Sequence, residues 1–428
     1  MNRFVCWTFG IVFLFTAAME VRGDILVSSV DPVTFQPSGV KRYDEWTGTP
    51  LPVGDIPAVS IPLGESAVPL FPSSMATTSD GRLFVADSAG LVLQFDAATS
   101  TPLPHPSAPL PPGVFATTQT DPPTFGFPAL TIGPDSMLYV IDGDDVSGSG
   151  GKPGIRIFNP DTGAPVDTLL ESTTVEFGRL TGLAFDPAGD LLLADYDLGT
   201  IFKVDVENDT IESFITQAPG EALAPTGMYV DGSGNIFVSH APSLNPSGHS
   251  VLQYDPDGTN PSTLATLPPV SGAFVSSPTN MWPNRAGDGL LVAALGMGSA
   301  GTGQVFEVDF AGNPAVPFLS EIEPASAVIV VPDLLPGDFN GDGNVDNADY
   351  VKWKDDFGSQ VIPTSGADGN GDGLVDIADY TIWRNTLGAT GLVPGAAVVA
   401  NVPEPATVWV AGMALLGTVC WYRKQGRC

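Results

Sequence analysis

The residues best suited to chemistry form an acidic pattern that occurs twice, thirty residues apart, near the C-terminal end of the chain. Each copy has Asp or Asn at positions 1, 3, 5, 9 and 12 of a twelve-residue stretch, with Gly343 or Gly373 at position 6. Calcium takes oxygen ligands at these positions of a loop, position 7 supplies its backbone carbonyl, and the glycine permits a sharp turn. The sequence therefore predicts two Ca²⁺ sites. Their expected ligands are Asp338, Asn340, Asp342, Asn344, Asp346 and Asp349 in the first loop, and Asp368, Asn370, Asp372, Leu374, Asp376 and Asp379 in the second.

Two features of these loops leave alternatives open. Position 12 is Asp rather than Glu, so the shorter side chain leaves bidentate closure, and with it the calcium affinity, undecided. Asn, Asp and Gly are also common turn formers, so a pair of Asx-rich turns without an ion is the rival interpretation. The match of two aligned loops to one template favours calcium.

An amphipathic helix is predicted after each loop, and the two helices align with each other as well as the loops do. Over about fifty residues the segment resembles a type I dockerin, a family with two EF-hand-type calcium loops whose helices dock onto cohesin domains. The resemblance implies a small helical module and a cohesin-like partner. This chain has Asn347-Ala348 and Ile377-Ala378 where the family often has Ser-Thr, which leaves the partner's identity open. The aligned helix positions are Tyr350 with Tyr380, Trp353 with Trp383, Lys354 with Arg384, and Phe357 with Leu387.

The larger part of the chain, from Asp24 to Val331, consists of short β-rich runs separated by Gly, Pro, Asp and Asn, which predicts an all-β domain. A unit of three strands recurs at intervals of roughly 45 to 60 residues. The second strands of five units are expected at Leu83 to Asp87, Leu138 to Asp142, Leu191 to Asp195, Ile236 to His240 and Leu290 to Ala294. The third strands are expected at Leu91 to Phe95, Ile155 to Phe158, Ile201 to Val204, Val251 to Tyr254 and Val305 to Val308.

A sixth unit is divided between the two ends of this domain. Ile25 to Ser29 and Val40 to Tyr43 match second and third strands without a first, and Pro324 to Val330 is a strand without a successor. Pairing of the C-terminal strand with the N-terminal sheet would close six blades into a ring and remove the exposed edges. We therefore expect a six-bladed β-propeller. It resembles NHL-repeat and gluconolactonase- or regucalcin-like propellers over about 300 residues.

The propeller resemblance raises the question of channel chemistry, because enzymes of the regucalcin-like type hold a divalent ion there with Glu, Asn and Asp. Only Asn280 is a plausible ligand among the aligned inner positions, and Thr, Ala and Gly offer no charge for a hard cation. We interpret the channel as non-catalytic. The inner positions, as aligned from the sequence, are Ala76-Thr77, Leu130-Thr131, Thr181-Gly182, Thr226-Gly227, Thr279-Asn280 and Ala325-Ser326.

Acidic and imidazole side chains also end several second strands. Asp87, Asp142 and Asp195 hold the same repeat position, where an Asp side chain can bond local backbone N–H groups, and this structural interpretation is preferred to a carboxylate ring. His240 holds that position in the fourth unit, so a lyase with a His base is a less favoured alternative. The Pro-rich stretch from Thr101 to Pro128 is expected to be a surface insertion between blades.

The ends of the chain carry export signals. Met1 to Gly23 has Arg3, an apolar run and a small-residue cleavage site, as in a secretory signal peptide, with an uncleaved anchor as the alternative. At the other end, Val402-Pro403-Glu404-Pro405 precedes the apolar run Ala406 to Tyr422 and a basic terminus. This closely resembles a PEP-CTERM sorting signal, which implies an exosortase-type processing enzyme and a Gram-negative-type bacterium that makes exopolysaccharide. The apolar run is just long enough to span a bilayer. An unprocessed anchor in the cytoplasmic membrane is therefore the alternative to a processed signal.

Composition narrows the function further. The net charge of −32 excludes nucleic acid, which needs a basic surface. All three cysteines lie in the signal and the tail, so the exported body has no disulfide and no thiol nucleophile.

These observations predict an exported surface or matrix protein that binds a ligand, with polysaccharide among the candidates, and docks through calcium. The alternative is an extracellular enzyme acting on a sugar lactone, a glycoside or another polysaccharide-derived substrate. A third alternative makes the calcium repeat a clamp with no partner. The expected domains are a signal peptide at 1–23, the propeller at 24–332, the dockerin-like module at 333–388, a linker at 389–401, and the sorting signal with its transmembrane helix at 402–428.

Overall fold

The computed structural model describes most of the chain between Asp24 and Ala389. The predicted signal peptide and the predicted sorting tail lie outside the described residues. The described ranges are 24–30, 37–44, 47–51, 55–56, 61–63, 66–68, 72–78, 80–87, 90–97, 99–107, 110–117, 129–142, 154–170, 175–219, 221–242, 249–269, 273–284, 286–298, 303–331, 335–340, 344–360, 367–369 and 374–389.

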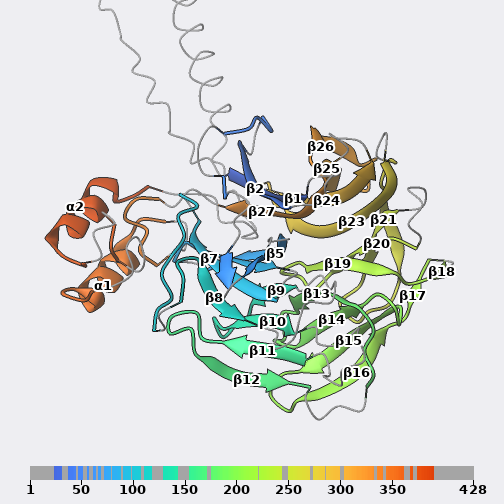
Figure 1. Cartoon of the computed structure of the whole chain (residues 1–428), viewed down its shortest axis with the longest axis horizontal. Coiled ribbons are helices and arrows are strands. Elements are labelled where there is room, and N and C mark those ends of the chain that lie inside the picture. Colours follow the sequence, from blue (N-terminus) through green and yellow to red (C-terminus); the bar gives the residue numbers. More distant parts are fainter. Residues whose placement is uncertain are drawn as a thin grey trace, which may run out of the picture. The chain divides into compact units, whose positions relative to one another are not determined.

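Six antiparallel sheets form the blades of a propeller, as predicted (Figure 1). Their innermost strands contact one another in a closed order around the centre. These inner strands are β27 (Ala325–Val331), β5 (Pro72–Thr77), β9 (Leu130–Ile132), β13 (Leu180–Phe185), β19 (Pro225–Val230) and β23 (Ala273–Pro283).

The remaining strands follow outward in each blade, and the predicted second and third strands are confirmed to within a few residues. The second strands are β1 (Asp24–Val30), β6 (Arg82–Asp87), β10 (Leu138–Asp142), β14 (Leu191–Asp195), β20 (Ile236–His240) and β24 (Gly289–Gly298). The third strands are β2 (Pro37–Asp44), β7 (Leu91–Asp96), β11 (Gly154–Phe158), β15 (Thr200–Asp205), β21 (Ser250–Tyr254) and β25 (Gly303–Asp309). The outer strands are β8 (Val114–Thr117), β12 (Pro165–Leu169), β16 (Thr210–Ile215), β22 (Ser262–Thr266) and β26 (Val316–Ile322).

Two small hairpins lie outside the blades and were not predicted from the sequence. One joins β3 (Ile61–Leu63) to β4 (Ser66–Val68), and the other joins β17 (Gln217–Ala218) to β18 (Glu221–Ala222).

The ring is closed by the two ends of the propeller chain. β27 pairs antiparallel with β1, from Asp24 opposite Val331 to Ser29 opposite Ala325, and β1 continues the sheet to β2. Every residue of β27 is buried. The predicted closure by the C-terminal strand is therefore confirmed.

Burial on both faces explains why the second strands are almost continuously apolar. Side chains alternate across a strand, so Leu83 and Val85 of β6 pack toward the preceding blade while Phe84 and Ala86 pack toward the next. Six apolar clusters result, each drawn from two consecutive blades. Each blade is thus stabilised mainly by its two neighbours, at roughly 1.5 to 3 kcal/mol per fully buried aliphatic side chain.

The Pro-rich stretch from Thr101 to Pro128 is not purely an insertion between blades, so that prediction was wrong in part. It contains β8, the outer strand of the blade formed by β5, β6 and β7. Residues 101–107 and 110–113 form a wide connection held by Gln94, whose Nε2 donates to Pro104 O at 2.7 Å. The prolines that suggested a loop therefore flank a short strand.

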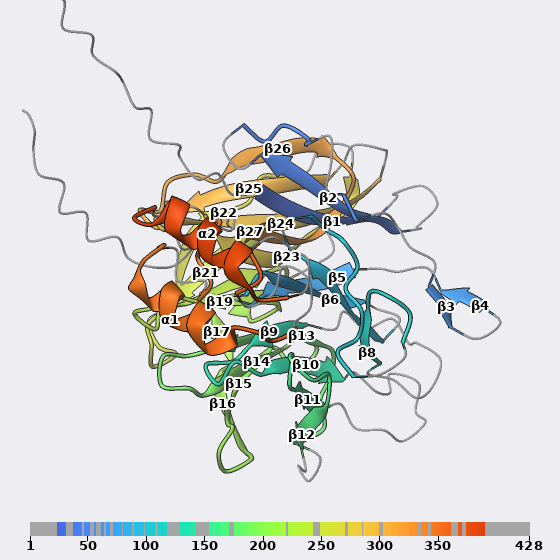
Figure 2. The ribbon, with the colours of Figure 1, turned by 90° about the vertical axis from the view of Figure 1, so that its left-hand side faces the viewer.

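Two loop–helix repeats follow the propeller, with α1 at Asn347–Asp356 and α2 at Ile377–Thr386 (Figure 2). Each helix has an Asp N-cap and a capping box, which satisfies two of the free N–H groups at its start. The indoles cross between repeats: Trp353 Nε1 donates to Asp376 O at 2.8 Å, and Trp383 Nε1 donates to Asp346 O at 2.6 Å. The apolar core is drawn from this segment alone and comprises Leu335, Phe339, Val345, Ala367, Val375 and Trp383.

Among the residues that the structure describes, neither helix is long and apolar enough to cross a membrane. The transmembrane helix predicted at 406–422 lies outside those residues.

We predict that Gly227→Ala destabilises the propeller by about 1 to 3 kcal/mol or more, because overpacking forces backbone shifts. A Cβ at Gly227 on β19 would overlap the carbonyl of Thr279 on β23. Gly232→Ala is the matched control, since nothing lies within 4 Å of a Cβ at that position. Urea unfolding of both variants measures the difference, and equal stability of the two would contradict the close packing of β19 against β23.

We also predict alkaline destabilisation through Tyr43 of β2, whose pKa is raised to about 12 by burial and by the charges of Asp55 and Glu323. The unfolded chain releases this proton near pH 10, so the contribution of Tyr43 to stability is complete below about pH 10 and is lost as the pH rises to about 12. A shift of this size corresponds to roughly 2 to 3 kcal/mol. Tyr43→Phe should lose less unfolding free energy than the native chain between about pH 9 and pH 11.5, and identical losses would refute the assignment.

Candidate functional site

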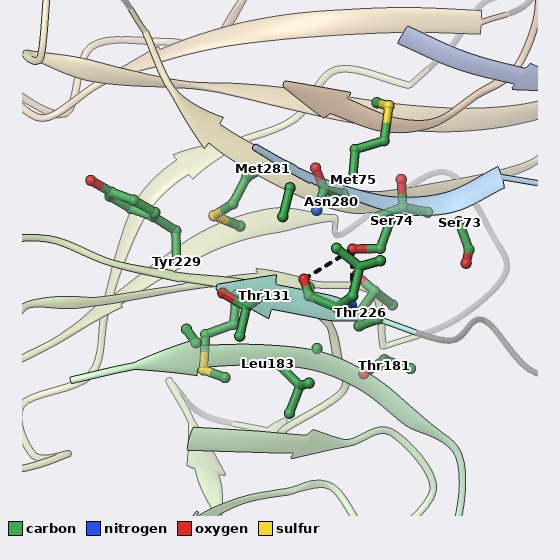
Figure 3. A pocket seen from close by; sticks show the side chains of 18 of the residues that line it. Ser73, Ser74, Met75, Thr131, Thr181, Leu183, Thr226, Tyr229, Asn280 and Met281 are labelled. Carbon is green, nitrogen blue, oxygen red and sulfur yellow. Dashed lines mark hydrogen bonds between the residues drawn. The ribbon is translucent and has the colours of Figure 1, made fainter. Parts of the chain in front are cut away.

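A cavity of about 630 Å³ lies at the centre of the propeller and is lined by residues of all six inner strands (Figure 3). Its volume is in the range of pockets that hold small molecules. The inner positions predicted from the sequence line it, apart from Ala325, and so do Ser73, Ser74 and several apolar side chains that sequence reasoning missed.

A β-bulge near the start of the inner strand places a hydroxyl residue in this cavity. In four blades the pairing with the second strand shifts around Ser73, Thr181, Thr226 and Thr279. In the closing blade it shifts around Ser326. A bulged residue is left out of the regular backbone pairing between the two strands. Its side-chain hydroxyl can therefore bond a backbone carbonyl nearby.

These bulges correct the sequence alignment of the first blade. Ser73 and Ser74, not Ala76 and Thr77, are the structural equivalents of Thr181 and Gly182. The second blade was misaligned too, because Leu130 lies opposite Val140 and therefore corresponds to Leu183, not to Thr181. The error arose because a short apolar run does not by itself fix which of its residues lies opposite a given residue of the second strand.

Three of the bulge hydroxyls donate to carbonyl groups within their own blade. Ser73 donates to Ala86 O at 3.3 Å, Thr226 to Ser239 O at 3.2 Å, and Thr279 to Ala293 O at 3.3 Å. Each carbonyl belongs to the second strand of the same blade. Hydroxyl donors therefore replace the backbone donors that the bulges remove.

Other hydroxyls connect one blade to the next. Thr181 donates to Pro225 O at 2.9 Å, Ser239 to Thr279 O at 2.8 Å, and Ser326 to Pro72 O at 2.7 Å. Asn280, the one plausible ligand in the sequence interpretation, accepts from Val328 N at 3.2 Å through Oδ1. The polar groups around the cavity are thus largely engaged in holding the ring together.

Among the residues that the structure describes, the lining of the cavity has one charged side chain and no carboxylate or imidazole. That charge, Arg179, forms a double hydrogen bond with Asp197, with Nε to Oδ2 at 3.0 Å and the NH2 group to Oδ1 at 2.6 Å. The hydrogen bonds from Arg179 lower the pKa of the Asp197 carboxyl. The guanidinium also lies 4.5 Å from the ring centre of Tyr196. The charge at the edge of the cavity is therefore neutralised.

Among the strand-ending acids, Asp195 takes the structural role that was preferred for this position. Asp195 is fully buried and accepts from Gly178 N at 2.7 Å and Leu198 N at 3.0 Å. Burial raises its pKa, against the opposing effect of these N–H donors. Asp87 is also fully buried, and the side chain of Asp142 lies outside the described set.

His240 has the same role as Asp195. It is fully buried, its Nδ1 accepts from Ala224 N at 3.1 Å, and it is not among the residues that line the cavity. The position at the end of the second strand therefore holds an acceptor that fixes the chain entering the inner strand.

The first acidic loop is organised around Asp349 at position 12. This carboxylate is fully buried, and it accepts from Phe339 N at 2.8 Å, Asn340 N at 3.1 Å and Asp346 N at 2.7 Å. The bonds join the start of the loop to its end. Oδ1 accepts the first two of these bonds and Oδ2 accepts the third, so Oδ2 keeps a second lone pair for a metal ion.

The second loop repeats this arrangement. Asp379 is fully buried and accepts from Asp376 N at 2.7 Å, and Asp368 at position 1 is 3% exposed. Leu374 at position 7 has an exposed side chain and pairs through its backbone with Gln360, as expected of a residue that contributes only a carbonyl.

The donor set fits a hard cation. Burying a carboxylate is costly unless it is paired or bound to a metal, and both position-12 carboxylates, Asp349 and Asp379, are fully buried. No cluster of three acidic, His or Cys side chains suited to a metal occurs within the described ranges. Asp342, Asn370 and Asp372 of the two loops fall outside those ranges.

Comparison with known proteins identifies the C-terminal tail. Residues 401–424 match the PEP-CTERM protein-sorting motif. This range contains the predicted Val402-Pro403-Glu404-Pro405 sequence, so the predicted sorting signal is confirmed. The chain is therefore an exported, cell-envelope-associated protein, with an exosortase-type enzyme as its processing partner.

The solved structures add similarity at low sequence identity. The chain is similar to a protein of unknown function from Bacteroides caccae, with 14% identity, a TM-score of 0.47, and coverage of 72% of this chain and 99% of that chain. It is also similar to a chain of a nidogen/laminin complex, with 11% identity, a TM-score of 0.47, and coverage of 72% and 98%. No curated protein sequence matches the chain.

We predict that Thr226→Val lowers the free energy of unfolding by about 1 kcal/mol, because Ser239 O loses a hydrogen bond that the bulge cannot replace. Thr210→Val on the exposed start of β16 is the matched control and should be nearly neutral. Urea unfolding measures both, and a stable Thr226→Val variant would show that the bulge hydroxyls are dispensable.

Proposed function

We propose that this chain is a ligand-binding protein of the cell envelope rather than an enzyme, and that its two acidic loops bind two Ca²⁺ ions. The propeller supplies the ligand site, and the paired loop–helix module supplies a calcium-dependent docking element. The sorting motif brings both to the outside of the cell.

The observation that carries the binding role is the chemistry of the cavity. The described part of its lining has no general base, no nucleophilic carboxylate and no acidic ligand for a metal, and the one cation found there is paired with Asp197. Hydrolysis of a lactone or glycoside calls for at least one of these groups next to the substrate. Hydroxyl and apolar side chains can hold a molecule, but they supply none of these groups.

The calcium role rests on the two buried position-12 carboxylates, Asp349 and Asp379, and on the identical backbone bonds that they accept from Asp346 and Asp376. Each loop carries four carboxylates within twelve residues. Without a cation these charges repel one another, so a bound Ca²⁺ should stabilise each loop.

A docking role is supported by apolar side chains exposed on the module. Ile377 at the start of α2 is 63% exposed, and Phe357 and Leu387, which follow α1 and α2, are each 55% exposed. Phe357 and Leu387 are related by the repeat, as in the dockerin-like pattern of the sequence. We propose a cohesin-like protein as the partner.

We predict two tightly bound Ca²⁺ ions per chain in residues 24–401, which contain every described strand and helix. Asp342→Ala and Asp372→Ala should each remove one ion and destabilise one loop, and the propeller should keep its melting transition. Asp257→Ala, an exposed turn acid of the propeller, is the control and should retain both ions. Metal analysis after gel filtration and circular dichroism make the measurements.

Three results would contradict the proposal. An ion that survives both loop substitutions would place metal elsewhere in the chain. Loss of the propeller transition together with the ions would show that the two parts do not fold independently. Turnover of a lactone or glycoside that a substitution in the cavity abolishes would make the chain an enzyme.

A further inference from the structure

The groups left over in the central cavity define the kind of ligand it can take. Most hydroxyls there donate to protein carbonyls, as described above. Among the described hydrogen bonds, none engages Asn280 Nδ2, whose partner atom Oδ1 is held by Val328 N. Trp282, two residues further along β23, has a buried indole N–H with no acceptor. Because the indole nitrogen is enclosed by protein, Asn280 Nδ2 is the unused donor on β23 that a ligand can reach, and it calls for an acceptor.

The remainder of the lining is largely apolar. Met75, Leu183, Met228 and Met281 border it at equivalent places on four inner strands, where they are at most 7% exposed and also belong to the apolar clusters between blades. Phe185 lines the cavity as well, as does Tyr229 (Figure 3). Methionine is flexible and polarisable, so it adapts to irregular apolar shapes. A hydroxyl that has donated its proton to the protein presents mainly its oxygen and, in Thr, its methyl group to the cavity.

The charges around the cavity disfavour a ligand that is itself an ion of either sign. Within the described ranges no acidic side chain lines the cavity to attract a cation, and Arg179 is already paired with Asp197. A charged ligand would lose its hydration there without a counterion, and this is costly. The lining therefore matches a molecule without net charge.

We propose that the cavity binds a neutral, largely apolar molecule that carries a carbonyl or ether oxygen, with Asn280 Nδ2 donating to that oxygen. Esters and similar neutral amphiphiles are the class that meets these requirements. This inference rests on the proposed binding role of the propeller and adds the ligand class to it. A saccharide, which is polar over most of its surface, fits the same lining less well because that lining is largely apolar.

The test is displacement of a neutral fluorescent hydrophobe, N-phenyl-1-naphthylamine, from residues 24–401. Three competitors share one chain length and differ in charge: methyl octanoate, octanoate and octyltrimethylammonium. Methyl octanoate should displace the probe at a concentration about tenfold or more below that of either ion, because each ion must be desolvated. Maltotriose should not displace it.

A substitution at Asn280 tests the position of the contact. Asn280→Asp keeps an oxygen to accept from Val328 N, but it replaces the donor with a negative charge. Methyl octanoate should then bind about tenfold more weakly, and octyltrimethylammonium should become the strongest of the three competitors. Asn159→Asp is the matched control, since Asn159 Oδ1 accepts only backbone N–H groups in a turn and Asn159 is not part of the lining.

The outcomes separate this inference from the proposed function. Equal affinity for the three octyl compounds, no binding of the probe, or displacement by maltotriose would overturn the ligand class and leave a calcium-binding, non-catalytic protein in place. Hydrolysis of methyl octanoate would overturn the binding role itself. The unsubstituted chain alone decides the charge preference, so the test does not depend on the folding of a variant.

Discussion

The pairing of β27 with β1 is the interaction on which the rest of the propeller depends. It joins residues about 300 positions apart, Asp24 with Val331 and Ser29 with Ala325, and completes the sixth blade. Without it, the apolar faces of the first and fifth blades would each lose a neighbour. Joining such distant segments carries a large loop-closure entropy, which the burial of the whole of β27 offsets.

Closure also determines the chemistry at the centre. Six strands meeting around one axis cannot all keep regular pairing, and the bulges at five of them bring hydroxyl residues into the cavity. Those hydroxyls bond carbonyls of the same blade or the next. Most polar groups around the cavity therefore form hydrogen bonds within the ring. The surface that remains for a ligand is neutral and mostly apolar, with an amide donor at Asn280.

The module after the propeller applies a related principle on a smaller scale. A buried Asp at the end of each loop holds the loop and the start of the helix together through backbone N–H groups. The crossed indole bonds of Trp353 and Trp383 then join the two repeats. Aromatic stacking across the repeats, including Tyr350 with Trp383 and Trp353 with Tyr380, completes the core.

The sequence by itself determined the blade number, the split sixth blade, the paired acidic loops and the sorting motif. Each of these was predicted from a local pattern: alternation along a strand, ligand spacing within a loop, or a short motif before an apolar run. Local patterns can be recognised in the sequence because their physical causes act between residues that are near one another in the chain.

Only the tertiary structure decided the inner register, the use of each hydroxyl and the neutrality of the cavity. Ser73 was missed because the apolar pattern does not fix which residues of the inner and second strands lie opposite each other. The bonds of Thr181 with Pro225 and of Ser326 with Pro72 connect separate blades. Likewise, the positive charge of Arg179 is compensated only because the fold places the carboxylate of Asp197 against it. These properties arise from contacts between distant segments, which no window along the chain contains.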